Sequence, residues 1–464
     1  MERVRCLVLA GLSGGSGKSV VSVGLIAALK NRGRGVAPFK KGPDYIDAGW
    51  MSKAAGQPCY NLDAYLMTPA AIATTFQGHI HGSSFAVVEG NRGIFDGVNA
   101  EGEFSTAELA LQLDLPVLLV VNCSKTTRTV AALVLGCQAF DPRIRFAGVI
   151  LNQIATSRHE SIIRQSLENY TDLPVLGIMP RLKKDIFPMR HLGVTPHQEY
   201  AEAGEAVDRL AALAEIHFDL DAIISRMREV MPLPPVTSEQ ILPKLTIGVL
   251  RDAAFQFYYE ENLEALRAAG ARLVMIDALH SGALPADLDG LYIGGGFPET
   301  SARQLADNSS FRQSIRDRID AGLPVYAECG GLIFLGRSIL LQGQEYPLAG
   351  VFPVTFAISA KPQAHGYSAF TVEKANSFYP VGARIKGHEF RYSTVHQWDG
   401  APEDLVLQME RGAGFSGGRD GLVKNNVLAL YTHVMSSGTP QWVEGFIAAV
   451  RKYSAGKPIA VSLV

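Results

Sequence analysis

Cysteine is scarce in this chain, and the few that occur form no recognisable pattern. The sequence of 464 residues contains five cysteines, an odd number, and no two of them form a CxxC pair. A disulfide framework and a structural zinc site are therefore poorly supported. The five are Cys6, Cys59, Cys123, Cys137 and Cys329.

Long apolar runs and a large net charge are missing as well. No apolar stretch is long enough to span a membrane, and the first residues enter an apolar strand and a glycine loop rather than a signal peptide. The formal net charge of −2 gives no sign of a protein that binds nucleic acid through its charge. We therefore expect a cytoplasmic protein with neither membrane nor nucleic-acid partners.

The composition that is present indicates a globular protein of two or three domains, because the chain is longer than one core usually organises. In its first half, short apolar runs alternate with amphipathic stretches such as Val20–Lys30 and Glu160–Tyr170, and a helical region at 199–231 ends this half. The rhythm predicts an α/β fold with βαβ units and a mostly parallel sheet covered on both faces. The expected strands are Val4–Ala10, Gly35–Phe39, Phe85–Val88, Pro116–Val121, Phe146–Leu151 and Val175–Ile178.

A proline-rich segment divides the chain. Residues 232–235 read Pro-Leu-Pro-Pro, and the polar stretch that follows ends at Pro243. Such composition resists both helix and sheet, so we expect a linker at 232–244 between domains at 1–231 and 245–464. The α/β rhythm resumes beyond it, with expected strands at Leu245–Leu250, Leu273–Ile276, Leu291–Ile293 and Val325–Ala327.

The strongest motif is the glycine-rich loop Gly11–Ser19, which follows the first expected strand and precedes a helix. Backbone N–H groups of such a loop can wrap a phosphate chain, with Lys18 reaching the β- and γ-phosphates and Ser19 holding Mg²⁺. Five residues rather than the usual four separate Gly11 from Gly17-Lys18, so the loop is a variant. A glycine turn that binds nothing is the simpler alternative, but the flanking strand and helix favour ATP. The expected nucleotide-binding residues are Ser13, Gly14, Gly15, Ser16, Gly17, Lys18 and Ser19.

Acidic residues follow the next expected strands. Asp44 and Asp47 lie in the segment after the second strand, while Glu89 and then Asp96 follow the third. Ligands of open parallel sheets bind at this edge, so the carboxylates suit substrate positioning, and Asp47 and Glu89 suit Mg²⁺ together with Ser19. Asp44, Asp47 and Asp96 could instead be simple turn formers.

In the second half, Cys329 stands between an expected strand and the glycines that open a helix. This is the geometry of a nucleophile elbow, which exposes the sulfur and offers backbone N–H groups to an oxyanion. Gly330 and Gly295 are the expected oxyanion donors, and His433, after the expected strand Val427–Tyr431, is the expected base. A lone cysteine is usually a small core residue, and Cys6 and Cys123 keep that interpretation.

Together, these motifs resemble the cobyrinic acid a,c-diamide synthase family over nearly the whole chain. The resemblance implies an N-terminal, ATP-binding domain of the dethiobiotin-synthetase type and a C-terminal class I glutamine amidotransferase domain. In that chemistry, Cys329 releases ammonia from glutamine, ATP and Mg²⁺ activate an acetate carboxylate of cobyrinate as an acyl phosphate, and ammonia displaces the phosphate. The segments that carry the resemblance are Gly11–Ser19, Pro38–Asp47, Asn61–Asp63, Glu89-Gly90, Gly294–Glu299, Ala327–Leu332, Gly387–Phe390 with Tyr392-Ser393, and His433.

The resemblance also implies a tetrapyrrole substrate, and a homodimer is left open. Four positions depart from the pattern of corrin-making members, namely Lys41, Ala48, Met51 and Arg391, and they leave a sirohaem- or sirohydrochlorin-type ring as the alternative to cobyrinate. Met435 stands where many class I glutaminases have glutamate, so the group that orients His433 is unidentified. The expected substrate or acyl-phosphate residues are Lys40, Lys41, Asp44, Tyr45, Asp96, His388 and Arg391, with Lys386 and Trp50 as further candidates.

Two other classes of protein compete with this interpretation. A partitioning-type P-loop ATPase would share the loop Gly11–Ser19, but it needs no glutaminase and leaves the elbow at Cys329 unexplained. A tetrapyrrole-binding chaperone without chemistry would have no use for Lys18, Cys329 and His433 together. The sequence therefore favours the ATP- and glutamine-dependent amidotransferase.

Overall fold

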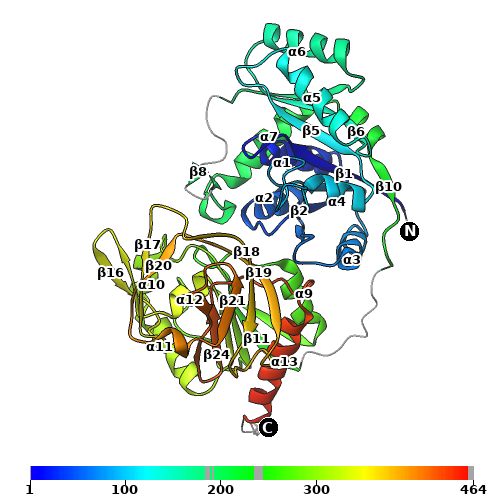
Figure 1. Cartoon of the computed structure of the whole chain (residues 1–464). Coiled ribbons are helices and arrows are strands. Elements are labelled where there is room, and N and C mark those ends of the chain that lie inside the picture. The colour runs from blue at the N-terminus through cyan, green and yellow to red at the C-terminus, as the bar shows by residue number, and fades with distance from the viewer. Residues whose placement is uncertain (1, 183–188, 191–192, 235–243, 458–464) are drawn as a thin grey trace. The chain divides into compact units, whose positions relative to one another are not determined.

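A computed structural model describes residues 2–182, 189–190, 193–234 and 244–457 of the chain. The chain divides into two compact units, Met1–Val236 and Thr237–Val464 (Figure 1). Most of the expected linker, residues 235–243, lies outside the described residues. No helix in the part of the chain that the structure describes combines the length and the apolar character needed to cross a membrane.

The first unit is built on a parallel sheet in the order β3-β2-β4-β1-β5-β6-β7, which confirms the predicted α/β fold. Leu7 and Leu9 of the central strand point into one core together with buried residues of α1, α2, α7 and α8. The strands are β1 (Val4–Gly11), β2 (Val36–Lys41), β3 (Tyr60–Leu62), β4 (Phe85–Glu89), β5 (Val117–Asn122), β6 (Phe146–Ile154), β7 (Val175–Pro180), β8 (Met189–Arg190), β9 (Gly193–Val194) and β10 (Arg228–Val230). The helices are α1 (Lys18–Asn31), α2 (Ile46–Ala55), α3 (Pro69–His79), α4 (Thr106–Gln112), α5 (Thr129–Phe140), α6 (Ser157–Tyr170), α7 (Ala203–His217) and α8 (Leu220–Arg226), with a 3-10 turn at His197–Glu199.

The region expected to be helical at 199–231 ends differently. It contains α7 and α8, but its last residues form β10, which pairs antiparallel with the beginning of β1, Val4 opposite Val230. The physical reason is the stagger of the sheet. Pairing of β1 with β5 begins only at Val8, so the edge of Val4–Cys6 is left for another strand to cover.

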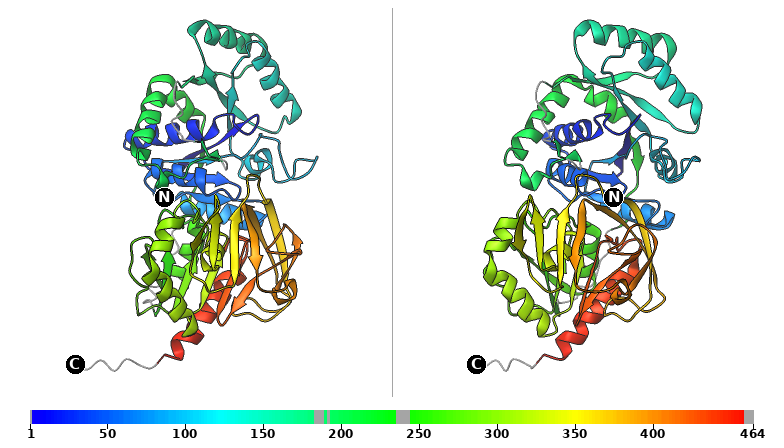
Figure 2. Two further views of the ribbon diagram at one scale, coloured as in Figure 1. Left: turned by 90° about the vertical axis from the view of Figure 1, so that its left-hand side faces the viewer. Right: turned by 60° about the vertical axis from the view of Figure 1, so that its left-hand side comes forward.

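The second unit has a six-stranded sheet in the order β12-β11-β13-β14-β24-β23, parallel except for β23 at its edge. Both faces are buried: Ile293 and Ala327 belong to one core, while Tyr292 and Tyr326 belong to the other. The last helix, α13 (Pro440–Ala455), packs beside β11 and α9 (Figure 2). The other helices are α9 (Glu260–Ala268), α10 (Ala302–Asp307), α11 (Ser309–Asp320) and α12 (Gly330–Leu335), with a 3-10 turn at Pro402–Asp404.

Two smaller sheets, β16-β15-β17-β20 and β19-β18-β21-β22, lie between β14 and β24 in sequence and interrupt the α/β rhythm. All neighbouring strands in these two sheets pair antiparallel except β15 and β17, which pair in parallel. The apolar pattern alone did not predict these sheets. The strands of the second unit are β11 (Leu245–Leu250), β12 (Ala271–Ile276), β13 (Gly290–Ile293), β14 (Val325–Glu328), β15 (Ser338–Leu341), β16 (Gln344–Pro347), β17 (Val354–Ile358), β18 (Ala364–Val372), β19 (Arg384–Arg391), β20 (Ser393–Trp398), β21 (Leu407–Arg411), β22 (Arg419–Asp420), β23 (Leu422–Lys424) and β24 (Val427–Leu430).

The packing of α1, the helix that follows the glycine loop, depends on a close approach to α7. A Cβ atom on Gly24 would lie 3.0 Å from the carbonyl oxygen of Leu210. We expect Gly24→Gln to push the helices apart and lower the free energy of unfolding by about 2 kcal/mol. Gly136→Gln is the matched control, because nothing lies within 4 Å of a Cβ there in α5, and it should be neutral or slightly stabilising. Urea unfolding measures both, and equal stability of the two variants would contradict this account of the α1–α7 contact.

Candidate functional site

The glycine loop is held in shape by residues outside it. Gly15 and Gly17 adopt φ angles of 73° and 90°, which favour glycine. The side-chain amide of Asn152, at the end of β6, donates a hydrogen bond of 2.8 Å to the carbonyl of Ser16. A Cβ atom on Gly17 would lie 1.9 Å from that amide nitrogen, so the close approach requires glycine at this position.

Lys18 lies across the loop rather than away from it. Its Nζ donates to the carbonyl of Ser13 at 3.1 Å and to the carbonyl of Arg92 at 2.8 Å. Ser16 Oγ accepts from the Ser13 N–H at 3.1 Å and donates to its carbonyl at 2.9 Å, which closes the turn. Burial lowers the pKa of Lys18, and the nearby charge of Lys40 lowers it further. An anion entering the loop would relieve that cost, because it adds negative charge to that of Glu89, Asp47 and Asp96.

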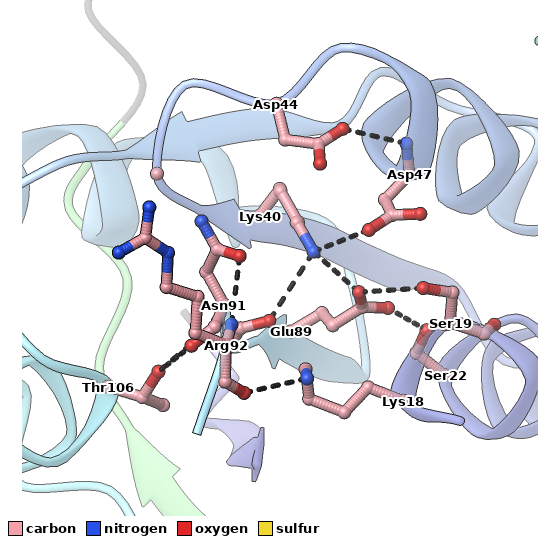
Figure 3. A network of polar contacts seen from close by, with 12 residues as sticks. Lys18, Ser19, Ser22, Lys40, Asp44, Asp47, Glu89, Asn91, Arg92 and Thr106 are labelled. Atoms are coloured by element: carbon pink, nitrogen blue, oxygen red, sulfur yellow. Dashed lines mark hydrogen bonds and ion pairs between the residues drawn. The ribbon is translucent and has the colours of Figure 1, made fainter. Parts of the chain in front are cut away.

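A buried ion-pair cluster lies beside the loop, at the ends of β2 and β4 (Figure 3). Lys40 Nζ lies 2.8 Å from Asp47 Oδ2 and 2.6 Å from Glu89 Oε1, and Ser19 Oγ donates to the same Glu89 oxygen at 3.2 Å. Burial alone would lower the pKa of Lys40, but the charges of Asp47 and Glu89 raise it well above its ordinary value. Burial raises the pKa of Glu89, whereas Lys40 outweighs burial at Asp47 and lowers its pKa.

The same cluster brings together the three residues expected to hold a metal. Ser19, Asp47 and Glu89 present only oxygen atoms, and all three are linked through Lys40 Nζ or Glu89 Oε1. A hydroxyl and one or two carboxylates, completed by phosphate oxygens and water, form the ligand set that Mg²⁺ prefers. The side chains present therefore fit the ion by their chemistry.

Asp44 and Asp96 do form turns, as the simpler interpretation expected, but at the same edge. Asp44 Oδ1 accepts from the Asp47 N–H at 2.9 Å at the beginning of α2, and Asp96 Oδ2 accepts from the Gly93 N–H at 2.8 Å. Burial and the charge of Asp47 raise the pKa of Asp44 to about 6. The charge of Asp96 raises the pKa of Lys18, so this carboxylate lies near the loop. Tyr45 lies half-buried directly before α2.

Lys41 differs from its neighbour Lys40, because no hydrogen bond or ion pair joins its Nζ to another described residue. It is only 7% exposed. Burial lowers the pKa of Lys41 to about 8, with the carboxylate of Asp63 opposing and the cations Arg92 and Lys40 adding to the shift. A buried lysine without a counter-ion at the binding edge of the sheet is a candidate anion site.

In the second unit, Cys329 occupies a strained elbow between β14 and α12. Its φ angle is 46°, an uncommon value for a residue with a side chain, and its N–H is tied to the carbonyl of Leu430 at 2.8 Å. Strain of this kind gathers at functional sites. Burial raises the pKa of Cys6 and of Cys123 to about 12, as expected of core thiols.

The expected oxyanion glycines lie against this elbow. A Cβ atom on Gly295 would lie 2.4 Å from Cε1 of His433, and one on Gly330 would lie 2.8 Å from the backbone nitrogen of Gly296. The loop that follows β13 therefore packs against both the elbow and the histidine, where only glycine fits. Their role as oxyanion donors stays a prediction.

His433, after β24, reaches the elbow as expected and is 2% exposed. Burial alone would lower the pKa of His433, but a hydrogen bond with Cys329 and the carboxylate of Glu328 raise it to about 10. The distance from His433 Nδ1 to Glu328 Oε2 is 3.5 Å. Glu328 was not predicted as a site residue, although a glutamate that ends an otherwise apolar strand directly before the cysteine was an available signal.

Three of the expected substrate contacts are occupied within the fold. His388 is 4% exposed, stacks on His433 with ring centroids 4.8 Å apart, and bonds the Tyr259 hydroxyl through Nδ1 at 3.0 Å. Arg391 is buried, donates to the carbonyl of Gly414 at 2.7 Å, and lies 3.8 Å above the Tyr431 ring. Trp50 is 1% exposed and donates to the carbonyl of Thr195 at 2.9 Å.

These positions correct parts of the sequence interpretation. Arg391 is not a free cation for a substrate carboxylate, and Trp50 is not available to cover a ring face, because both are committed to the core of their own units. His388 lies beside the cysteine–histidine pair, and its expected role near the macrocycle stays a prediction. Of the departures from the family pattern, Ala48 and Met51 are buried residues of α2, which leaves Lys41, at the end of β2, as the one at the binding edge of the sheet. Lys386 is exposed on β19.

Comparison with known proteins divides the chain in the same way as the two sites do. Residues 7–192 match the model of the CobQ/CobB/MinD/ParA nucleotide binding domain, and residues 246–440 match that of the CobB/CobQ-like glutamine amidotransferase domain. Three curated relatives are each called cobyrinate a,c-diamide synthase. The chain is 40% identical to that of Magnetococcus marinus, with 95% of this chain and 96% of the relative covered. It is 39% identical to that of Archaeoglobus fulgidus, with 92% and 93% covered, and 36% identical to one from Dehalococcoides mccartyi, with 97% and 99% covered.

The contrast between Lys41 and Lys40 predicts opposite effects of the same substitution. The folded pKa of Lys41, about 8, lies below its ordinary value of 10.5, so its buried charge destabilises the fold below pH 8, and this cost fades as the pH rises towards 10.5. We expect Lys41→Met to raise the free energy of unfolding at pH 7 by up to about 3 kcal/mol. This gain in stability should disappear near pH 10. Lys40→Met, which leaves Asp47 and Glu89 without their cation, should lower the free energy of unfolding. Thermal unfolding of both variants across this pH range is the measurement, and a Lys41→Met variant less stable than wild type at pH 7 would overturn the assignment.

Proposed function

This chain belongs to the family of cobyrinate a,c-diamide synthases, and from its two sites we propose that it converts the a- and c-acetate carboxylates of cobyrinate into amides, using ATP and the ammonia released from glutamine. The observation that carries the proposal is the presence, in one chain, of a phosphate-type loop beside a charged cluster and of a strained cysteine elbow beside a histidine. A nucleotide switch needs only the first, and a simple hydrolase needs only the second.

The second unit supplies ammonia. His433 takes the proton of the Cys329 thiol, and the thiolate attacks the side-chain amide carbon of glutamine. The oxyanion of the tetrahedral intermediate would be stabilised by backbone N–H groups at Gly330 and Gly295, which lie against the elbow. His433 then returns the proton to the leaving nitrogen, so ammonia departs and a glutamyl thioester remains for water to hydrolyse.

The first unit activates the acceptor. A carboxylate is a poor electrophile and hydroxide a poor leaving group, so transfer of the γ-phosphoryl group of ATP to an acetate carboxylate makes an acyl phosphate that ammonia can attack, with phosphate leaving. Lys18 would neutralise charge on the phosphates, which its position across the loop supports. Lys40, paired with Asp47 and Glu89, would interact with the acetate or the transferred group. Ser19, Asp47 and Glu89 would hold Mg²⁺, which supplies charge neutralisation when ATP is bound.

We propose that Lys41 meets the ring carboxylates, and that Asp44, Tyr45 and Asp96 belong to the substrate or acyl-phosphate site at the same edge. Lys41 carries the argument for an anionic ring, since its Nζ is buried without a counter-ion among the described residues. A ring with more carboxylates, of the sirohaem or sirohydrochlorin type, is the second candidate for the same reason. We propose a cytoplasmic enzyme whose partners are glutamine and the tetrapyrrole, and a homodimer stays open.

Amidation assays on each ring distinguish the two candidate substrates. With ATP and glutamine, we expect mass spectrometry to show successive amidation of cobyrinate, each step replacing a hydroxyl by an amino group. The same assay with sirohaem and sirohydrochlorin tests the second candidate in parallel. If neither ring changes mass while glutamine-stimulated ATP hydrolysis continues, the tetrapyrrole assignment is wrong and only the amidotransferase chemistry stands.

Two variants should separate the halves of the reaction. Cys329→Ala should abolish amidation driven by glutamine but retain amidation driven by ammonium salts, because only the nitrogen source is lost. Lys18→Ala should reduce amidation with either source by about a hundredfold or more, while the thiol of Cys329 still reacts with iodoacetamide. Equal loss with both nitrogen sources in Cys329→Ala would make the cysteine structural, and full turnover in Lys18→Ala would remove the phosphate-loop assignment.

A further inference from the structure

We propose that Glu328, the residue directly before the nucleophile, is the positioning residue that orients His433 for glutamine hydrolysis. The inference rests on the proposed function and deepens it. It assigns to Glu328 the role that many class I glutaminases give to a glutamate two residues after the histidine. That position is Met435 here, which is 1% exposed and has no charge to offer.

The carboxylate of Glu328 is fixed in front of the imidazole. Glu328 is fully buried. Its Oε1 accepts from the N–H of Val434 at 3.1 Å, and its Oε2 accepts from the hydroxyl of Tyr292 at 3.1 Å and lies 3.5 Å from His433 Nδ1. The bond to Val434 ties the carboxylate to the very next residue after the histidine, so the two side chains keep their relative position.

The parallel sheet explains why a residue of β14 meets a residue beyond β24. Side chains alternate along a strand, so Glu328 points to the same face as Tyr326, and Ala327 points to the other. Glu328 is paired with Leu430 at the end of β24, and the chain then continues to His433. The next residue of β14, Cys329, turns at the elbow. Histidine and carboxylate are therefore brought together by strand register, without any sequence motif.

The charge balance of the buried site also supports the pairing of Glu328 with His433. A buried carboxylate is costly unless it is paired, and the donors from Val434 and Tyr292 are both neutral. His433 is the only ion-pair partner of Glu328 among the residues that the structure describes. The nearby buried carboxylate of Glu389 is engaged elsewhere, because it accepts from the N–H of Gly414 at 3.1 Å and faces Arg391 at 3.9 Å.

The chemistry follows from the geometry. With the Glu328 carboxylate 3.5 Å from Nδ1 of His433, the imidazole is held in the tautomer that leaves Nε2 to take the proton from Cys329. The imidazolium so formed is stabilised by the carboxylate, which keeps its own charge throughout. The proton then passes from His433 to the departing ammonia, and the imidazole returns to its neutral form.

The test is Glu328→Gln, which keeps the shape and the acceptor oxygen but removes the charge. We expect kcat for glutamine hydrolysis to fall about tenfold to a thousandfold with little change in KM, while ammonia-driven amidation is retained. Since the carboxylate favours the imidazolium, its removal should also move the alkaline limb of the kcat/KM profile to lower pH, and Glu328→Asp should restore part of the rate.

A matched control and an independent readout keep the outcome interpretable. Asp420, another fully buried carboxylate of this unit, accepts from the N–H groups of Gly421 and Tyr431, so Asp420→Asn should leave the pH profile in place. The rate at which iodoacetamide alkylates Cys329, followed against pH, reports the coupling to His433 without any substrate. An unchanged alkylation profile and unchanged glutaminase activity in Glu328→Gln would overturn the proposal. Failure of the proposed function would look different, since wild type itself would then amidate no ring with either nitrogen source.

Discussion

Parallel pairing of neighbouring strands is the constraint on which both sites depend. In the first unit, β1 pairs in parallel with β4, and β4 with β2, so the glycine loop, Glu89 and the segment that begins after Lys41 all leave the sheet at one edge. In the second unit, β14 pairs in parallel with β13 and β24, which brings the loop after β13, the elbow at Cys329 and His433 to one edge. Residues more than a hundred positions apart thus meet because strand ends in parallel sheets coincide.

Each site also keeps a buried carboxylate close to a group that carries or accepts a proton. Glu89 lies 2.6 Å from Lys40, and Glu328 lies 3.5 Å from His433. Such charges are costly to bury and add little to stability, so their presence indicates that they serve the chemistry. In the first unit, the pair fixes the ammonium of Lys40 at the edge where we propose that phosphate and carboxylate bind. In the second, it holds an imidazole in the orientation that thiol activation needs.

The cationic residues of the first unit illustrate how neighbouring positions on a strand acquire opposite roles. Lys40 and Lys41 are adjacent in β2 and point to opposite faces, so one finds Asp47 and Glu89 while the other finds no counter-ion among the described residues. Arg391 was predicted from the sequence as a further cation for the substrate. In the structure, its guanidinium donates to two backbone carbonyls and lies over the Tyr431 ring. Charge alone therefore does not identify a substrate contact, and only the partners of each side chain do.

The sequence by itself determined the parallel α/β architecture, the phosphate-type loop with Lys18 and Ser19, the acidic residues at strand ends and the cysteine elbow. Each of these features depends on a local pattern of consecutive residues. The sequence did not determine β10 or the two small sheets of the second unit, since their pairing depends on which edges other strands leave open. The tertiary structure alone decided that Glu328 faces His433, that Trp50 and Arg391 are buried, and that Lys41 lacks a partner among the described residues. These are properties of side-chain direction and long-range register, which no short segment of sequence encodes.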